Sequence, residues 1–332
     1  MTDKKIDFLA IGDITTDAFI ALQDATVNCD VDNENCTLCM SFGDKIPYKK
    51  VTVVRAVGNS PNASVSAARL GLNSAALTYV GDDQNGKECI ESLEADGVIT
   101  DFVQIEKGSL TNYHYVLLFD AERTILVKHT EFKYSIPEMP EPKWIYLSSL
   151  SDNSLPYHIE IAEYLKAHPD VKLAFQPGTF QIKMGHEKLK DLYEQSELFF
   201  CNKQEAQRIL HTDEDDINKL LEGIHNLGPK IAIITDGPGG AYTFDGEEIW
   251  YTPMYPDAAP PVDRTGAGDS FASTFTVALA QGKSIPEALS WGPVNSMSVV
   301  QYIGAQKGLL SKDALEGYLK DAPDSYKVKK IN

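Results

Sequence analysis

Short apolar runs alternate with amphipathic stretches along most of the chain. Apolar runs bounded by turn residues are typical of buried strands, and apolar positions that recur every three or four residues are typical of helices. The runs predict strands at 8–11, 144–148, 172–175, 198–201 and 231–235, and the stretches predict helices at 156–167, 186–194, 203–210 and 215–226. This alternation predicts βαβ units and a parallel sheet with helices on both faces.

Two regions of the first half depart from this alternation. Residues 24–50 are polar and irregular, and a segment of this type does not fit inside a compact core. A short strand is predicted after it, at 51–54. Residues 113–119 and 124–128 are apolar runs on either side of a turn, which predicts a hairpin.

Length and charge limit the kind of protein this is. A chain of 332 residues with 43% hydrophobic residues can form one large α/β domain or two modest ones. Its net charge of −18 argues against nucleic acid or an anionic membrane as partner. The sequence contains no apolar stretch of membrane-spanning length and starts without a signal-peptide pattern, so a cytoplasmic location is expected.

The five cysteines are few and odd in number: Cys29, Cys36, Cys39, Cys89 and Cys201. In a chain expected to be cytoplasmic, this count argues against a disulfide framework. The first three follow a C-x6-C-x2-C spacing, which supplies three of the four ligands of a zinc site. Neither a histidine nor a fourth cysteine lies nearby in sequence, so free thiols are favoured and a metal-binding module is the alternative.

The most informative stretch runs from 261 to 271 and reads PVDRTGAGDSF. A glycine turn at 266–268 precedes a helix whose apolar face includes Phe271 and Phe275. The first amides of a helix have no intrahelical partner and lie at the positive end of its dipole, so this helix start suits an anion such as phosphate.

Asp269 is unusual at such an anion site. A carboxylate in the first turn of a helix is often only a favourable partner of the helix dipole. Beside a phosphate-binding turn, however, it would repel the ligand unless it handles a proton. A base that takes the proton of a hydroxyl, while the turn stabilises a transferring phosphoryl group, explains both features.

Residues 263–269, DRTGAGD, resemble the signature of the ribokinase-like (PfkB-type) carbohydrate and nucleoside kinases. The resemblance implies that Asp269 is the catalytic base and that Gly266, Ala267 and Gly268 form the anion hole. Arg264 departs from the pattern, because the family usually has a small residue there. The resemblance also implies a single domain over 1–332: a three-layer α/β/α core with a mostly parallel sheet and a small β-sheet lid. The lid strands are expected from about 14–56 and 111–130.

Further matches imply where the phosphoryl acceptor binds. Asp17, in a Thr-rich turn after the first strand, stands where the family binds substrate hydroxyls. Gly58 and Asn62 match a Gly-Gly motif followed by Asn, although Val57 replaces its first glycine, and Asn59 lies between them. Helix capping by Asn59 or Ser60 is the alternative for this segment. The lid hairpin adds Thr111 and Arg123 as further candidates near the substrate.

Matches in the second half imply a nucleotide site. Asn202 and Glu205 fit an Asn-x-x-Glu motif, which the resemblance links to the placement of the phosphates and of Mg²⁺, with the ion held through water. The other candidates are Thr235, Gly237 and Gly240 in a glycine turn after a strand, Asn295 near the adenine, and Asp263 beside a monovalent cation such as K⁺. The strand at 172–175 ends in Gln176-Pro, where the family often has Asn-Pro, and ligands tend to bind at such strand ends.

Other nucleotide-binding patterns fit less well. Residues 81–87, GDDQNGK, nearly match a P-loop, but Glu88 stands where a Ser or Thr would hold Mg²⁺. This turn is expected to line the sugar pocket or to cap a helix near Gly86. The glycine turns at 237–240 and 266–268 both lack the third glycine of a dinucleotide fingerprint, so a Rossmann dehydrogenase is a poor fit.

The predicted reaction is therefore transfer of the γ-phosphoryl group of ATP, with Mg²⁺, to a hydroxyl of a sugar or sugar-like molecule. A nucleoside kinase is the rival within the family, because Phe42, Tyr113 and Tyr115 of the lid are candidates for stacking on a base. A sugar- or nucleotide-binding regulator without catalysis is the rival from another class, and the intact Asp269 and Glu205 argue against it. Exposed lid strands sometimes pair into homodimers.

Overall fold

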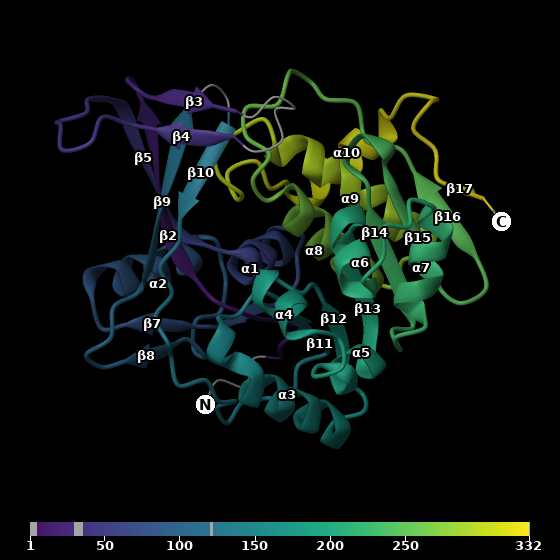
Figure 1. The fold of residues 1–332 in the computed structure, drawn as a ribbon. Helices are drawn as coiled ribbons and strands as arrows, with labels where there is room; N and C mark the ends of the chain where they lie inside the picture. The colour runs from purple at the N-terminus through teal and green to yellow at the C-terminus, as the bar shows by residue number, and fades with distance from the viewer. Residues whose placement is uncertain (1–4, 30–35, 120–121, 332) are drawn as a thin grey trace.

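The computed structural model describes residues 5–29, 36–119 and 122–331. Its described part contains a nine-stranded sheet in the order β17-β16-β15-β14-β13-β12-β11-β1-β6 (Figure 1). The strands from β14 to β6 are parallel, and β15, β16 and β17 are antiparallel to their neighbours. The α/β class with a mostly parallel sheet is confirmed. The strand bounds are β1 Phe8–Ile11, β6 Ser74–Leu77, β11 Trp144–Leu147, β12 Lys172–Phe175, β13 Ser196–Asn202, β14 Ile231–Thr235, β15 Ala241–Phe244, β16 Ile249–Thr252 and β17 Lys329–Lys330.

Helices cover both faces of this sheet, because each central strand sends apolar side chains to both sides. Leu9 and Phe175 belong to the core on one face, and Phe8 and Tyr146 to the core on the other. The first face carries α3 (Leu155–Ala167), α5 (Lys190–Gln195), α6 (Lys203–Leu210) and α7 (Ile217–His225). The second carries α1 (Asn59–Arg69), α8 (Ala267–Ala280), α9 (Ile285–Val299) and α10 (Lys312–Lys320). In the parts of the chain that the structure describes, no helix combines the length and apolarity needed to cross a membrane.

A second sheet of four strands forms the lid, in the order β10-β9-β2-β5. Figure 1 shows it standing beside the core, at the upper left. Its strands are β2 Thr15–Leu22, β5 Tyr48–Val57, β9 Asn112–Phe119 and β10 Glu122–Leu126. Strands β9 and β10 pair antiparallel, as the hairpin pattern predicts, and Asp120 and Ala121 of its turn lie outside the described residues. Asp17 lies in β2 and not in a turn, which corrects the sequence-based interpretation.

The remaining elements are short. Strands β7 (Tyr79–Gly81) and β8 (Gln104–Glu106) pair beside α2 (Gln84–Ala95), and α4 (Thr179–Met184) follows β12. Asp83 is the N-cap of α2 and accepts from the backbone N of Gly86. Of the two roles expected for this turn, the structure therefore shows capping.

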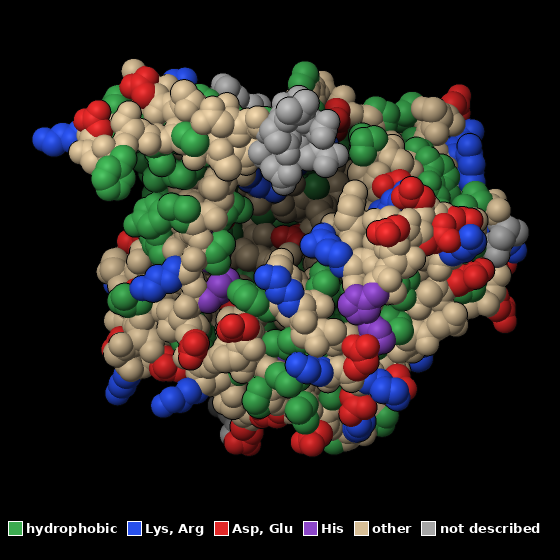
Figure 2. All heavy atoms as spheres, in the orientation of Figure 1, with side chains coloured by type: hydrophobic (Ala, Val, Ile, Leu, Met, Phe, Trp, Pro, Cys, Tyr) green, Lys and Arg blue, Asp and Glu red, His purple; other side chains and the backbone are tan. Residues whose placement is uncertain are grey.

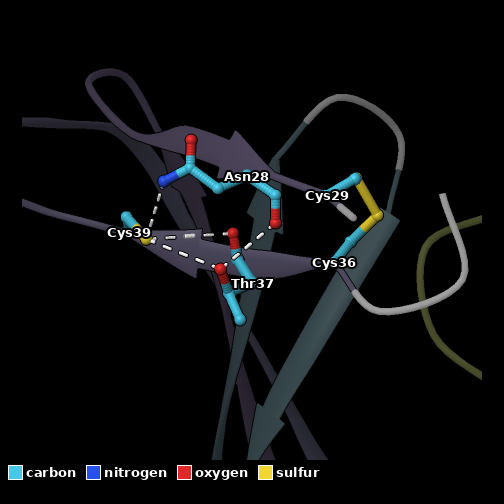
Figure 3. The surroundings of a disulfide bond; sticks show 5 residues. All are labelled: Asn28, Cys29, Cys36, Thr37 and Cys39. Carbon is cyan, nitrogen blue, oxygen red and sulfur yellow. Dashed lines mark hydrogen bonds between the residues drawn. A yellow bond between two sulfur atoms is a disulfide. The ribbon is translucent and has the colours of Figure 1, made fainter. Parts of the chain in front are cut away.

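The cysteine segment corrects a prediction. Strands β3 (Thr26–Asn28) and β4 (Thr37–Cys39) form an antiparallel pair in which Asn28 faces Thr37. That register brings Cys29 and Cys36 together, with Cα atoms 4.0 Å apart, and the two are joined by a disulfide (Figure 3). Free thiols were expected there because the cysteines were judged by number and compartment, without this pairing. The described residues contain no cluster of three or more His, Cys, Asp or Glu able to hold a metal, so the zinc alternative finds no support in them.

Candidate active site

The glycine turn places Asp269 in the first turn of α8, where the side chain is buried. Gly266 is the N-cap of this helix and has a left-handed backbone, with φ of 80°. A Cβ on Gly266 would lie 2.2 Å from Cβ of Ala305, closer than two carbon atoms can approach. Both facts require glycine at this position.

Three side-chain amides hold the carboxylate of Asp269. Oδ1 accepts from Nδ2 of Asn59 at 2.7 Å and from Nε2 of Gln176 at 3.3 Å, and Oδ2 accepts from Nδ2 of Asn62 at 2.8 Å. Burial raises the pKa of Asp269, and the amides of Asn62, Asn59 and Gln176 act in the opposite direction. The result is an oriented carboxylate that is more basic than an exposed one.

The first turn of α1 brings two of these amides, those of Asn59 and Asn62, into place. Gly58, and neither Asn59 nor Ser60, is the N-cap of α1, and it makes no side-chain cap hydrogen bond. The alternative interpretation, a side-chain cap by Asn59 or Ser60, is therefore wrong: Asn59 donates to Asp269 instead. Gly58 has φ of +126°, and a Cβ on it would lie 2.6 Å from the backbone O of Asp13. The backbones at Gly58 and Asp13 therefore approach too closely for any side chain at position 58.

A cavity of about 460 Å³ lies between the lid and the core. Figure 2 shows this face hollowed between the lid strands and the core helices. The cavity gathers residues predicted for the acceptor, the metal and the base, although they come from distant parts of the chain. They are Asp17, Gly58, Asn59, Asn62, Asn202, Glu205, Gly266, Gly268 and Asp269.

A second cavity, of about 250 Å³, adjoins the first and shares Thr235, Gly268 and Phe271 with it. Gly237, Gly240 and Ala267, which were predicted for the nucleotide or the anion hole, line it, together with apolar side chains such as Met297. Arg264, the departure from the signature, also lines this cavity. An apolar cavity that ends at a helix N-terminus can hold a base at one end and phosphates at the other.

Two sequence-based placements are wrong. Asn295 is fully buried between helices, donates to Oγ1 of Thr274 and accepts from the backbone N of Leu310, and lines neither cavity. Its neighbour Ser296 lines the smaller cavity instead. Thr111 bonds to Asp83 and Gly81 and lines neither cavity.

The lid contributes two cationic or titratable side chains to the larger cavity. Arg123, a candidate from the sequence, donates from Nη1 to Oδ1 of Asp263 at 3.0 Å and to Oγ1 of Thr265 at 2.5 Å. His114 was missed, although its Nδ1 lies 3.4 Å from Oδ1 of Asp17. The alternation of β9 was the available signal, since one of its two faces had to point inward.

Glu205 and Asn202 form a capping box at the start of α6. Oε2 of Glu205 accepts from the backbone N of Asn202, and Oδ1 of Asn202 accepts from the backbone N of Glu205, each at 2.8 Å. Burial raises the pKa of Glu205, and the hydrogen bond from Asn202 opposes this. The box fixes the carboxylate at the cavity wall and leaves Oε1 for a water held by a metal ion, so the residues fit the outer shell of Mg²⁺.

Several buried polar side-chain atoms have no hydrogen-bond partner among the described residues. They include Oδ2 of Asp13, Oδ1 of Asp17, Nε2 of His114 and Nδ1 of His129. Burial raises the pKa of Asp13 to about 7, while Tyr134, whose OH donates to Oδ1 at 2.8 Å, opposes the shift. Unsatisfied buried groups of this kind mark a place where a polar ligand or water completes the structure.

The chain is similar to a known protein family and to several known proteins. The model of the pfkB family of carbohydrate kinases matches residues 20–312. A ribokinase from Bacillus subtilis is 27% identical over 79% of this chain and 87% of its own. An ATP-dependent 6-phosphofructokinase from Thermoanaerobacterium thermosaccharolyticum is 26% identical over 95% of this chain and 94% of its own.

The fold has solved counterparts. The structure of Arabidopsis thaliana ribokinase complexed with ribose and ATP superimposes with a TM-score of 0.78 at 21% identity. The match covers 96% of this chain and 99% of that one. The core and lid are therefore those of a known architecture.

Proposed function

Because the chain belongs to the pfkB family of carbohydrate kinases, we propose that it transfers the γ-phosphoryl group of ATP to a hydroxyl of a sugar or sugar-like small molecule. The observation that carries the proposal is the position of Asp269. It is a buried carboxylate, held by three amides, at a glycine turn that borders both cavities. The relatives named above act on sugars or sugar phosphates, and one solved counterpart binds ribose and ATP.

In the proposed reaction, the acceptor hydroxyl attacks the γ-phosphorus while Asp269 takes its proton. The bond between the γ-phosphorus and the bridging oxygen breaks, and its electron pair leaves with ADP. The amides of Gly266, Ala267 and Gly268 at the start of α8 stabilise the charge on the transferring group. The lid excludes water, which limits hydrolysis of ATP.

Two ions belong to the proposal. Mg²⁺, when bound, neutralises the phosphates, and Asn202 and Glu205 would hold its water ligands. The second ion is a monovalent cation such as K⁺ beside Asp263. Both carboxylate oxygens of Asp263 already accept protein hydrogen bonds, from Arg123, Thr265 and Gly304. A cation on this carboxylate would therefore compete with Arg123, which a comparison of turnover in potassium and tetramethylammonium chloride tests.

The outer face of the lid supports pairing with a second copy of the chain. Tyr48, Val51, Val53, Tyr115 and Leu126 are exposed there. Strands β2, β5, β9 and β10 align these side chains on one face, opposite to Asp17 and His114. A homodimer through this face would cover them, and sedimentation of wild-type protein against Tyr115→Lys tests it.

The structure removes the observation that favoured a nucleoside acceptor. Tyr113 and Tyr115 lie on the face of β9 opposite to His114, and Phe42 is fully exposed, so none of the three lines the active-site cavity. These three side chains therefore give no support to a nucleoside acceptor.

The test is release of ADP from ATP and Mg²⁺ across a panel of hexoses, ribose, sugar phosphates and nucleosides, with Asp269→Ala as control. We expect one sugar or sugar phosphate to stimulate release in the wild type alone. Stimulation only by a nucleoside would replace the acceptor class, and binding of ATP without stimulation by any panel member would favour the regulator.

A further inference from the structure

We propose that Gln176, oriented by Tyr146, is a positioning residue that occupies Oδ1 of Asp269 and leaves Oδ2 as the atom that takes the proton. This inference rests on the proposed kinase function and adds to it the atom of the base that reacts. It concerns two residues that the signature does not include.

The orientation of the Gln176 amide follows from its two neighbours. Tyr146 of β11 is fully buried, and burial keeps the pKa of its phenol well above the ordinary value, with the negative charge of Asp269 adding to the effect. The phenol therefore keeps its proton and donates a hydrogen bond to Oε1 of Gln176. With Oε1 held by this donor, Nε2 points to Asp269.

The backbone holds Gln176 at the same point. Its N donates to the backbone O of Leu147 at 2.9 Å, directly after the paired strands β11 and β12. A flipped amide would place Oε1 against the carboxylate oxygen and would lose the phenol's hydrogen bond. The arrangement therefore favours ionised Asp269, the form that can accept a proton.

On the Oδ2 side of the carboxylate, the amide of Asn62 is likewise oriented by a neighbouring side chain. Nε2 of Gln306 donates to Oδ1 of Asn62 at 3.1 Å, so Nδ2 of Asn62 points to Oδ2 of Asp269. Asn59 and Gln176 both donate to Oδ1. An ionised carboxylate offers about four acceptor positions, and three are occupied.

The remaining acceptor position is on Oδ2. In the reaction, the acceptor oxygen forms its bond to the γ-phosphorus, its proton moves to Oδ2 of Asp269, and the bond to the bridging oxygen of ADP breaks with its electron pair. Gln176 and Tyr146 keep their protons throughout. They act by determining which carboxylate oxygen of Asp269 remains free to accept the proton.

The experiment compares Gln176→Met, Tyr146→Phe and the double variant by the pH dependence of kcat/KM. Methionine is similar in length to glutamine but has no N–H donor. The acid limb of the kcat/KM profile of Gln176→Met should therefore move to higher pH by about one unit. Tyr146→Phe should move it in the same direction by less. The double variant should match Gln176→Met, because Tyr146 acts through Gln176.

The charged groups around Asp269 are the same in all of these variants: Glu205 of α6, Asp17 of β2, His114 of β9 and Arg123 of β10. Gln181→Met is the matched control. Gln181 is a buried glutamine that donates to the backbone O of Ser148 and does not touch Asp269. The acid limb of Gln181→Met should lie at the same pH as that of the wild type. The KM for ATP should stay within about twofold of the wild-type value in every variant.

A second readout does not need turnover. In protein labelled with ¹³C at aspartate carboxyls, the signal of Asp269, assigned by its loss in Asp269→Asn, should titrate at higher pH in Gln176→Met than in the wild type. An unchanged titration, or an equal further shift when Tyr146→Phe is added to Gln176→Met, would overturn the inference. A wild type that turns over no acceptor but shows these shifts would contradict the kinase proposal alone.

Discussion

Arg123 of the lid and Asp263 of the glycine-turn segment form an ion pair between the lid and the core, with 3.0 Å between Nη1 and Oδ1. The two residues are 140 positions apart in sequence. Asp263 also accepts from the backbone N of Thr265 and of Gly304, so the lid is tied to the loop that precedes α8. A movement of the lid would therefore be coupled to the glycine turn at the start of α8.

Arg123→Met should weaken closure and leave the fold intact. The guanidinium is partly exposed, so the pair stabilises the closed lid by about 1 kcal/mol, and kcat/KM for the acceptor should fall roughly fivefold. Steady-state kinetics measure the fall. Arg55→Met is the control, because Arg55 is also a lid arginine but pairs with Glu88 outside the cavity. Equal losses in the two variants would contradict a specific latch.

Gly266→Ala should be far more harmful than an alanine at another left-handed glycine. Gly266 and Gly282 have nearly the same φ, +80° and +81°, but a Cβ on Gly282 meets nothing within 4 Å. Gly282→Ala should therefore cost only the backbone strain, about 1 kcal/mol of unfolding free energy. Gly266→Ala adds the collision with Ala305 and should lose at least about 2 kcal/mol and most turnover. Urea unfolding and kinetics measure both, and similar losses would contradict the argument.

Glu205→Gln should raise the concentration of Mg²⁺ required for half-maximal turnover. A glutamine oxygen can still accept from the backbone N of Asn202, so the cap of α6 persists while the charge is lost. Activity as a function of Mg²⁺ concentration measures the change. Glu287→Gln is the matched control, since Glu287 forms the capping box of α9 with Ser284 on the exterior. If both variants keep the wild-type Mg²⁺ dependence, Glu205 does not hold the ion.

Asp13 should make the protein less stable as pH rises. In the unfolded chain it ionises near 3.8, whereas in the folded protein burial raises its pKa to about 7. Its contribution to stability is therefore complete below pH 3.8 and is lost as pH rises to about 7, by up to about 4 kcal/mol. The groups facing it are Tyr134 and His129, and burial lowers the pKa of His129.

Asp13→Asn removes this titration. Its unfolding free energy should gain on that of the wild type between pH 4 and pH 7.5, because the variant has no carboxyl to ionise on unfolding. Urea unfolding of both proteins across this range measures the difference. Two curves that run parallel would show that Asp13 keeps an ordinary pKa in the folded state.

Local patterns predicted the core well because burial dictates them. Apolar runs such as 231–235 coincide with a strand that is covered on both faces, where the alternatives are few. The lid was harder. Asp17 looked like a turn residue because threonines precede it, yet β2 is stabilised by pairing with β5 and β9, which are distant in sequence.

The site was predictable where a residue type is required by the backbone or by the chemistry. Gly266 and Asp269 are of this kind. The contacts of Asn59 and Gln176 with Asp269 were not predictable, because an amide that caps a helix and an amide that reaches a distant carboxylate look alike in sequence. The prediction that Asn295 lies near the adenine was wrong for the same reason. Its hydrogen-bond partners, Thr274 and Leu310, come from neighbouring segments that the local pattern does not show.

The central claim is that Asp269 takes the proton of an acceptor hydroxyl during phosphoryl transfer. The most direct measurement combines the turnover of Asp269→Asn with its affinity for ATP by calorimetry. The account predicts that ATP binds as in the wild type while turnover falls by about 10²–10⁴ or more. Turnover equal to that of the wild type would remove Asp269 from the mechanism and contradict the account.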